Sequence, residues 1–173
     1  MKCGEDILEI YILRHFWIIL EHHWAQSQII DTHSLFFVAY EDYIGFLCTT
    51  PGIDAHEIKN YTSLPCNYTM GRPSNLNTPS ITISHLVGTQ TVTRTVTNVA
   101  GLETYVISTR MAPAIAVEAN PPAMTLKPGA SRKFSVTLTA RSVTGTYSFG
   151  EVLLKGSRGH KVRIPVVAMA YDR

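Results

Sequence analysis

The sequence predicts an all-β fold, an antiparallel β-sandwich of about seven strands, preceded by short helices and an irregular linker. After residue 79 the chain consists of short segments in which apolar and polar residues alternate, and turn residues separate these segments. No long helical repeat lies between them. Hydrophobic residues make up 45% of the 173 residues and charged residues 16%, which is typical of a compact domain and not of a disordered chain.

Two segments carry the clearest strand pattern. In residues 91–98, Val92 and Val96 share one face and threonines occupy the other, as a pleated strand requires. Phe134, Val136 and Leu138 alternate with polar residues and predict a half-buried strand. The other strand candidates are a first strand that begins with Ile81 and Ile83, and residues 103–110, 114–119, 146–155 and 161–170. Residues 127–130 predict a turn, and residues 156–159 predict a hairpin loop.

The last strand contains a proline that restricts its place in the sheet. Within residues 161–170, alternate apolar side chains face one way, whereas Pro165 lacks a backbone donor. This predicts an edge strand or a bulge at Pro165. The number and regular spacing of the short strands favour a sandwich of the immunoglobulin or fibronectin type.

Short helices are expected upstream of the sandwich. Residues 40–48 predict a helix with acidic residues in its first turn, and the Pro51-Gly52 pair ends it. Asp54 followed by Glu57 resembles a capping box that opens a second helix through Lys59. Residues 69–79 predict an extended linker. The expected organisation is an unassigned segment over 1–36, a linker with helices and a candidate disulfide loop over 37–79, and the sandwich over 80–173.

The first 36 residues carry an apolar spacing that suits a helix, but no targeting or metal-binding pattern. Glu9, Arg14 and His15 interrupt the apolar stretch, which therefore falls short of a membrane span. Glu5 and Asp6 stand where a signal peptide has positive charge, and no clear cleavage site follows, so the stretch is also a poor signal peptide. The histidines in this region do not stand at metal-site spacing. A net charge of +2 without a run of Lys or Arg predicts no nucleic-acid partner. We expect no cofactor, no metal and no small-molecule substrate.

Three cysteines leave the disulfide state open. Pairing Cys48 with Cys66 would close a loop of roughly 18 residues and leave Cys3 over, whereas three free thiols agree equally well with the count. Two glycosylation sequons begin at Asn60 and Asn67, on either side of Cys66, and favour an oxidising compartment. The sequence therefore predicts a Cys48–Cys66 bridge and glycans on Asn60 and Asn67.

Several short motifs occur in and beside the predicted strands, with the residues Arg94, Thr95, Val96, Thr97, Asn98, Val99, Thr104, Tyr105, Pro113, Tyr147, Ser148, Phe149, Gly150, His160, Val162, Arg163 and Pro165. Together these motifs closely resemble the carboxyl-terminal fibronectin type III-like domain of plant subtilisin-like serine proteases. Residues 75–81 are similar to that family's approach to the first strand, and residues 41–48 to the segment that links its catalytic domain to the sandwich. Cys66 stands where a second cysteine is usual. The resemblance spans about residues 37–172, and residues before Phe37 do not resemble the family.

The resemblance implies a non-catalytic accessory domain that packs on a subtilisin-like protease domain, in cis or in trans, and supports its stability. It also implies an extracellular or cell-wall location. Subtilisin chemistry needs an Asp, a His and a Ser, and neither a Gly-Thr-Ser nucleophile loop nor a G-x-S-x-G elbow occurs in the chain. We therefore expect no catalytic residue. Tyr40, Tyr43 and Phe46 would contact the protease domain, or alternatively fill the end of the sandwich itself.

Two other functions agree with the same residues. The chain could be a free-standing secreted module that binds other proteins, which would require an export signal. It could also be a fragment of a longer serine-type endopeptidase, which the loss of resemblance before Phe37 suggests.

Overall fold

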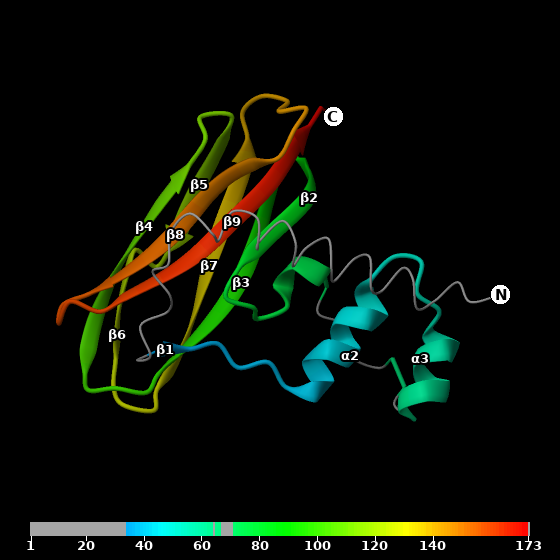
Figure 1. Cartoon of the computed structure of the whole chain (residues 1–173), viewed down its shortest axis with the longest axis horizontal. Helices are drawn as coiled ribbons and strands as arrows, with labels where there is room; N and C mark the ends of the chain where they lie inside the picture. The colour runs from blue at the N-terminus through cyan, green and yellow to red at the C-terminus, as the bar shows by residue number, and fades with distance from the viewer. Residues whose placement is uncertain (1–33, 64, 67–70, 173) are drawn as a thin grey trace, which may run out of the picture.

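The computed structural model describes residues 34–63, 65–66 and 71–172, which form a β-sandwich with two helices beside it (Figure 1). The β3 sheet has the strand order β1-β3-β7-β5, and the β9 sheet has the order β2-β9-β8-β4-β6. The strands are β1 Ser34–Leu35, β2 Ile81–Val87, β3 Thr89–Asn98, β4 Glu103–Met111, β5 Ile115–Asn120, β6 Ala123–Leu126, β7 Ser131–Ala140, β8 Ser148–Gly156 and β9 Lys161–Tyr171. The predicted all-β sandwich is confirmed.

Alternation places one face of each strand in the core, as predicted. On β3, Val92 and Val96 are fully buried, and on the neighbouring strand β7 the side chains of Phe134, Val136 and Leu138 are at most 1% exposed. Fully burying a side chain of this size stabilises a protein by about 1.5–3 kcal/mol. This face therefore carries a large share of the folding free energy.

The topology departs from a purely antiparallel sandwich of seven strands. Strand β2 pairs with β9 in parallel, and its register shifts between Ile83 and Leu86. The chain then crosses from the β9 sheet to the β3 sheet within one residue, Gly88, whose φ of 63° favours glycine. Strands β1 and β6 were not predicted. All other strand pairs are antiparallel.

Of the two features predicted at Pro165, the bulge is absent, whereas Pro165 itself has a paired strand on one side only, as at an edge, although β9 is an interior strand. Strand β9 lies between β2 and β8, and its register with β8 runs without a shift past Pro165, which stands opposite Glu151. On the other side, the ladder with β2 begins only at Ile81 opposite Val166. An interior strand accommodates this proline because the neighbour on the β2 side starts one residue later.

Two helices precede the sandwich, as the sequence predicts. They are α2 (Tyr40–Thr49) and α3 (Ala55–Thr62). Asp42 Oδ2 accepts a hydrogen bond from the Ala39 N–H at 2.9 Å, and Asp54 Oδ1 accepts one from the His56 N–H at 2.8 Å. Acidic side chains thus satisfy backbone donors where each helix begins. Neither helix is long and apolar enough to span a bilayer, and the described residues contain no other candidate.

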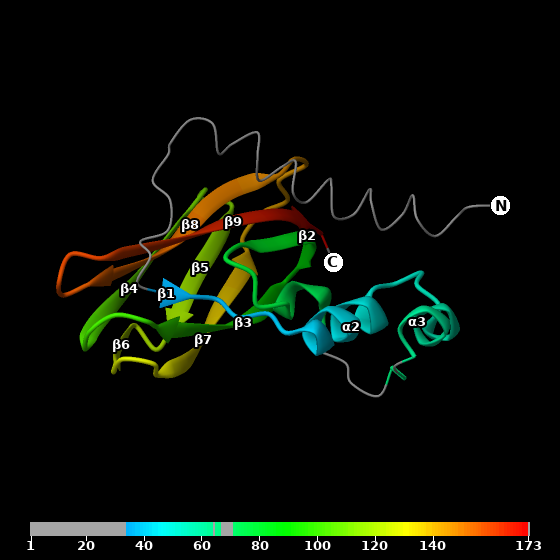
Figure 2. The same cartoon turned by 60° about the horizontal axis from the view of Figure 1, so that its bottom comes forward.

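The helices lie outside the sandwich, on the side where the short 3-10 helix η1 (Pro73–Asn75) is found (Figure 2). η1 contacts both α2 and β3. The segment over residues 69–79 was predicted to be an extended linker. Its described part, residues 71–79, contains η1 and so connects α2 with the β3 sheet.

Candidate docking surface

Three exposed aromatic side chains follow one another at the start of α2. Phe37, Tyr40 and Tyr43 are 63%, 58% and 49% exposed, and together they form what we call the aromatic surface. Residues three apart on a helix share a face, so Tyr40 and Tyr43 are neighbours. Ile44 and Gly45 are the buried residues of the helix. Exposed apolar side chains that lie close together are common at protein interaction sites, so this surface is a candidate for docking.

The alternative that these aromatics fill the end of the sandwich is wrong for Tyr40 and Tyr43, because about half of each side chain is exposed. Phe46, the third aromatic predicted for the junction, is half-buried. Its carbonyl accepts hydrogen bonds from Thr49 Oγ1 at 2.9 Å and Thr50 Oγ1 at 2.8 Å, which satisfy the end of the helix. Phe46 is therefore less available to a partner than predicted, whereas Phe37, which was not predicted for the junction, is exposed.

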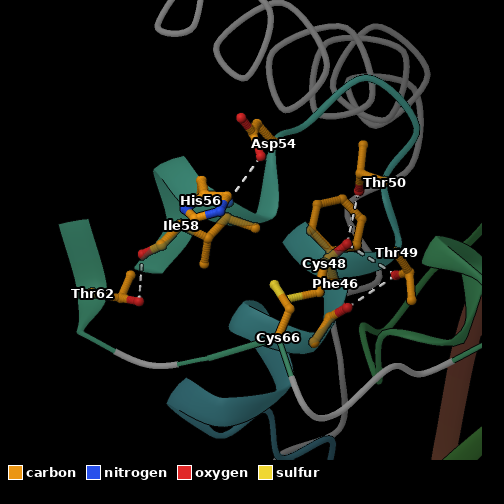
Figure 3. The surroundings of a disulfide bond; sticks show 10 residues. Phe46, Cys48, Thr49, Thr50, Asp54, His56, Ile58, Thr62 and Cys66 are labelled. Carbon is orange, nitrogen blue, oxygen red and sulfur yellow. Dashed lines mark hydrogen bonds between the residues drawn. A yellow bond between two sulfur atoms is a disulfide. The ribbon is translucent and has the colours of Figure 1, made fainter. Parts of the chain in front are cut away.

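A disulfide bond joins Cys48, near the end of α2, to Cys66, beyond the end of α3 (Figure 3). The bond closes the two helices into one unit. Ile58 is the one buried side chain of α3, and Thr62 Oγ1 donates to the Ile58 carbonyl at 2.7 Å. Because α3 buries so little apolar surface, the disulfide is the main tie that holds it beside α2.

Replacing both Cys48 and Cys66 by serine is expected to loosen the helical pair and leave the sandwich intact. A bridge across an 18-residue separation stabilises by about 3 kcal/mol in the chain-entropy treatment. Amide hydrogen exchange should show faster exchange over α2 and α3, while the β7 amides serve as an internal control. Equal exchange in both forms would show that the helices hold together without the bond.

A buried arginine ties the segment before β2 to the β3 sheet. Arg94 faces the core of the sandwich and is 2% exposed. Its Nη1 donates to the carbonyls of Ser74 at 2.9 Å and Thr93 at 2.8 Å, and its Nη2 donates to the carbonyl of Ser80 at 2.7 Å. Burial lowers the pKa of Arg94 to about 10, so the guanidinium is still protonated at neutral pH. A fixed cation thus binds three backbone carbonyls.

A second buried polar cluster is centred on Glu103, which is 1% exposed. Its Oε1 accepts from the Arg158 N–H at 2.8 Å, and its Oε2 accepts from Tyr105 Oη at 3.2 Å and lies 2.5 Å from His160 Nδ1. Tyr105 Oη also lies 3.3 Å from Ser34 Oγ on β1. The cluster therefore links β1, β4 and the hairpin between β8 and β9.

Opposing effects act on the Glu103 carboxyl. Burial raises its pKa, but the hydrogen bonds from His160, the Arg158 N–H and Tyr105 outweigh burial, and the net pKa is lowered. Glu103 is thus ionised at neutral pH and can only accept hydrogen bonds, so His160 Nδ1 carries the proton of their shared bond. The cluster is a satisfied structural network. The motifs of the sequence include Tyr105 and His160, but Glu103, which joins them, was not among the predicted residues.

The motif residues of β3 do not converge on one site. Alternate residues are buried in the sandwich: Arg94, Val96 and Asn98. The remaining ones are half-buried on the outer face or exposed beyond the strand: Thr95, Thr97 and Val99. The motif therefore describes a strand with two buried polar residues.

The motif residues of β8 and β9 serve packing and pairing. A Cβ at Gly150 would come within 2.3 Å of the Arg110 carbonyl oxygen, so only glycine fits. Arg163 Nε donates to Glu151 Oε2 at 2.5 Å, and Val162 is buried. The other predicted residues here are His160 in the Glu103 cluster and the partly exposed Tyr147, Phe149 and Pro165.

One of the two predicted glycosylation sites falls in α3. Asn60 is exposed in the last turn of the helix, and Asn67 lies outside the described residues. Across the part of the chain that the structure describes, no group of three or more His, Cys, Asp or Glu could hold a metal ion.

Known proteins resemble this chain in sequence. The family model of the fibronectin type-III domain matches residues 75–168. Subtilisin-like protease SBT2.5 of Arabidopsis thaliana is 68% identical over 152 residues, which cover 87% of this chain and 19% of that protein. Subtilisin-like protease SBT2.6 of the same plant is 69% identical with the same coverage. The chain thus spans about a fifth of the length of these relatives.

The similarity reaches further upstream than predicted. The 152 aligned residues outnumber those between Phe37 and residue 172, so residues before Phe37 also match. The expectation that the resemblance begins at Phe37 is wrong. Among solved structures, the ASH / PapD-like domain of human CEP192 is similar with a TM-score of 0.43 and 15% identity, over 56% of this chain and 83% of that one.

Proposed function

Because this chain belongs to the fibronectin type-III domain family and matches plant subtilisin-like proteases over most of its length, we propose that it is a non-catalytic accessory domain that binds and stabilises a subtilisin-like protease domain. The chain covers 19% of the first relatives, so most of each relative lies outside the match. That remainder is the proposed partner, in cis within one polypeptide or in trans. The disulfide and the relatives support an extracellular location.

The aromatic surface carries this proposal. Tyrosine and phenylalanine are enriched at the centres of protein interfaces because they bury a large area and lose little conformational freedom. Tyr40 and Tyr43 stand on a helix that the disulfide and η1 hold in place. Their exposure is therefore not the result of a loose terminus, and a partner surface would cover them.

The test is binding of the whole chain to the protease portion of the Arabidopsis relative, produced without its matching region. Replacing Tyr40 and Tyr43 by serine is expected to weaken binding roughly 30-fold or more, the effect of losing an aromatic hot spot. The chain should also raise the melting temperature of that portion, because a ligand that binds only the native state stabilises it.

Val106→Ser is the control, because Val106 is exposed to nearly the same fraction, 57%, and lies on β4, at the end of the sandwich away from α2 (Figure 1). It should bind as the unchanged chain does. If the unchanged chain neither binds in trans nor raises the melting temperature when fused in cis, the proposed function is wrong. If it binds and the double variant binds equally well, the interface lies elsewhere.

A further inference from the structure

Strand β1 stops pairing with β3 after only two residues. Ser34 lies opposite Asn98, and Leu35 opposite Thr97. In an antiparallel ladder each further step moves one residue forward on one strand and one back on the other. Continued in this register, Phe37 would stand opposite Thr95. The structure does not pair these two residues directly.

The side chain of Asn77 lies between them. Its Oδ1 accepts a hydrogen bond from the Thr95 N–H at 2.7 Å, and its Nδ2 donates to the Thr95 carbonyl at 2.9 Å. The same Nδ2 donates to the Phe37 carbonyl at 3.0 Å. One amide thus occupies both backbone groups of Thr95, as a paired strand residue would, and holds the backbone of Phe37 on its far side.

This insertion separates the incoming chain from the sheet at a defined point. Phe37 is the first residue of the aromatic surface, and α2 begins three residues later. The position at which the chain leaves β3 therefore determines where Tyr40 and Tyr43 stand relative to the sandwich. η1 supports the same arrangement from the other side, because it contacts both α2 and β3.

We propose that Asn77 is a positioning residue whose amide directs the chain off the edge of β3 and so fixes the orientation of the aromatic surface on the sandwich. Its importance for a partner rests on the proposed function above, but the orientation itself does not. Asparagine suits this position because one short side chain offers both an acceptor and two donors.

Asn77→Asp is the decisive variant. It keeps the shape and the acceptor for the Thr95 N–H, but it loses both donated bonds and turns a carboxylate oxygen towards the carbonyls of Thr95 and Phe37. Asn120→Asp is the matched control. It makes the same change of charge on β5, the other edge strand of the same sheet, where Asn120 is exposed and stands opposite Ser135.

Residual dipolar couplings of the isotope-labelled whole chain measure the orientation without a partner. In the unchanged chain and in Asn120→Asp, the amides of α2, β3 and β7 should fit one alignment tensor. In Asn77→Asp, α2 should require a separate tensor while β3 and β7 still fit together. A single tensor in Asn77→Asp, or a separate α2 tensor in Asn120→Asp, would overturn the proposal.

Asn77→Ala guards against a folding defect, because it removes the amide without adding a charge, and the same criterion applies to it. If the sandwich fails to fold in both Asn77 variants, Asn77 is a folding residue and the proposal is wrong. If α2 turns as expected but the unchanged chain never binds the protease portion, the proposed function fails while the positioning role stands.

Discussion

Phe134→Ala is expected to destabilise the sandwich by about 3–5 kcal/mol, because it removes a buried ring and leaves a cavity that the rigid sheets cannot close. Phe134 is 1% exposed on β7. It stands opposite Arg94 on β3, whose guanidinium is fixed by three carbonyls and cannot move in to fill the space. Small domains are stable by only about 5–15 kcal/mol, so the variant should be close to unfolding.

Urea denaturation of the purified chain measures this loss. Val143→Ala is the control, since Val143 is 55% exposed and its truncation should change the unfolding free energy by less than about 0.5 kcal/mol. A loss below about 1 kcal/mol for Phe134→Ala would mean that Phe134 does not lie in the core.

Glu103→Ala should also destabilise the sandwich, by about 2–4 kcal/mol, because it leaves buried hydrogen-bond donors without an acceptor at a cost of about 1–3 kcal/mol each. His160 Nδ1, the Arg158 N–H and Tyr105 Oη would each lose an acceptor. Glu151→Ala is the control, because Glu151 pairs with Arg163 where both are partly exposed and the expected cost is below about 1 kcal/mol. Equal losses of unfolding free energy in the two variants would show that burial does not make the contacts of Glu103 more stabilising than those of Glu151.

Acid should remove the contribution of Glu103. Its pKa in the folded chain lies below the ordinary value of 4.5, so the folded state favours the ionised carboxylate. The stabilisation is complete above pH 4.5 and is lost as the pH falls through the lower folded pKa. The unfolding free energy of the unchanged chain should therefore approach that of Glu103→Gln only at acidic pH. If the difference in unfolding free energy between the two forms instead grew as the pH fell, the pKa of Glu103 would not be lowered in the folded chain.

The strands were predictable from sequence wherever apolar and polar residues alternate over five residues or more, as on β3 and β7. Strand β6 escaped because it has four residues, Ala123–Leu126, and follows two prolines. Strand β1 has two residues, and its partner Asn98 lies far along the chain. The parallel pairing of β2 with β9 joins strands that lie far apart in the sequence. The alternation of apolar and polar residues within a strand does not determine which other strand it pairs with.

The polar residues of the site were predictable only in part. Tyr40 and Tyr43 could be identified as aromatic residues at the start of an expected helix, but the sequence alone does not determine whether their side chains are exposed. Alternation places Arg94 on the same strand face as Val92 and Val96, and Glu103 on the same face as Tyr105. The alternation alone would therefore have predicted that both charged side chains point into the sandwich. Charged residues are nevertheless expected to face water, and the partners that make their burial favourable come from distant segments.

The incoming chain also changes how the β3 sheet meets its surroundings. An exposed strand edge offers unpaired N–H and C=O groups to other copies of a chain and promotes aggregation. On β3, β1 covers Thr97 and Asn98, Asn77 binds both backbone groups of Thr95, and Asn75 binds the Thr93 N–H. The residues upstream of Ser80 thus cap the sheet, and self-association through this part of the edge is blocked for as long as they stay in place.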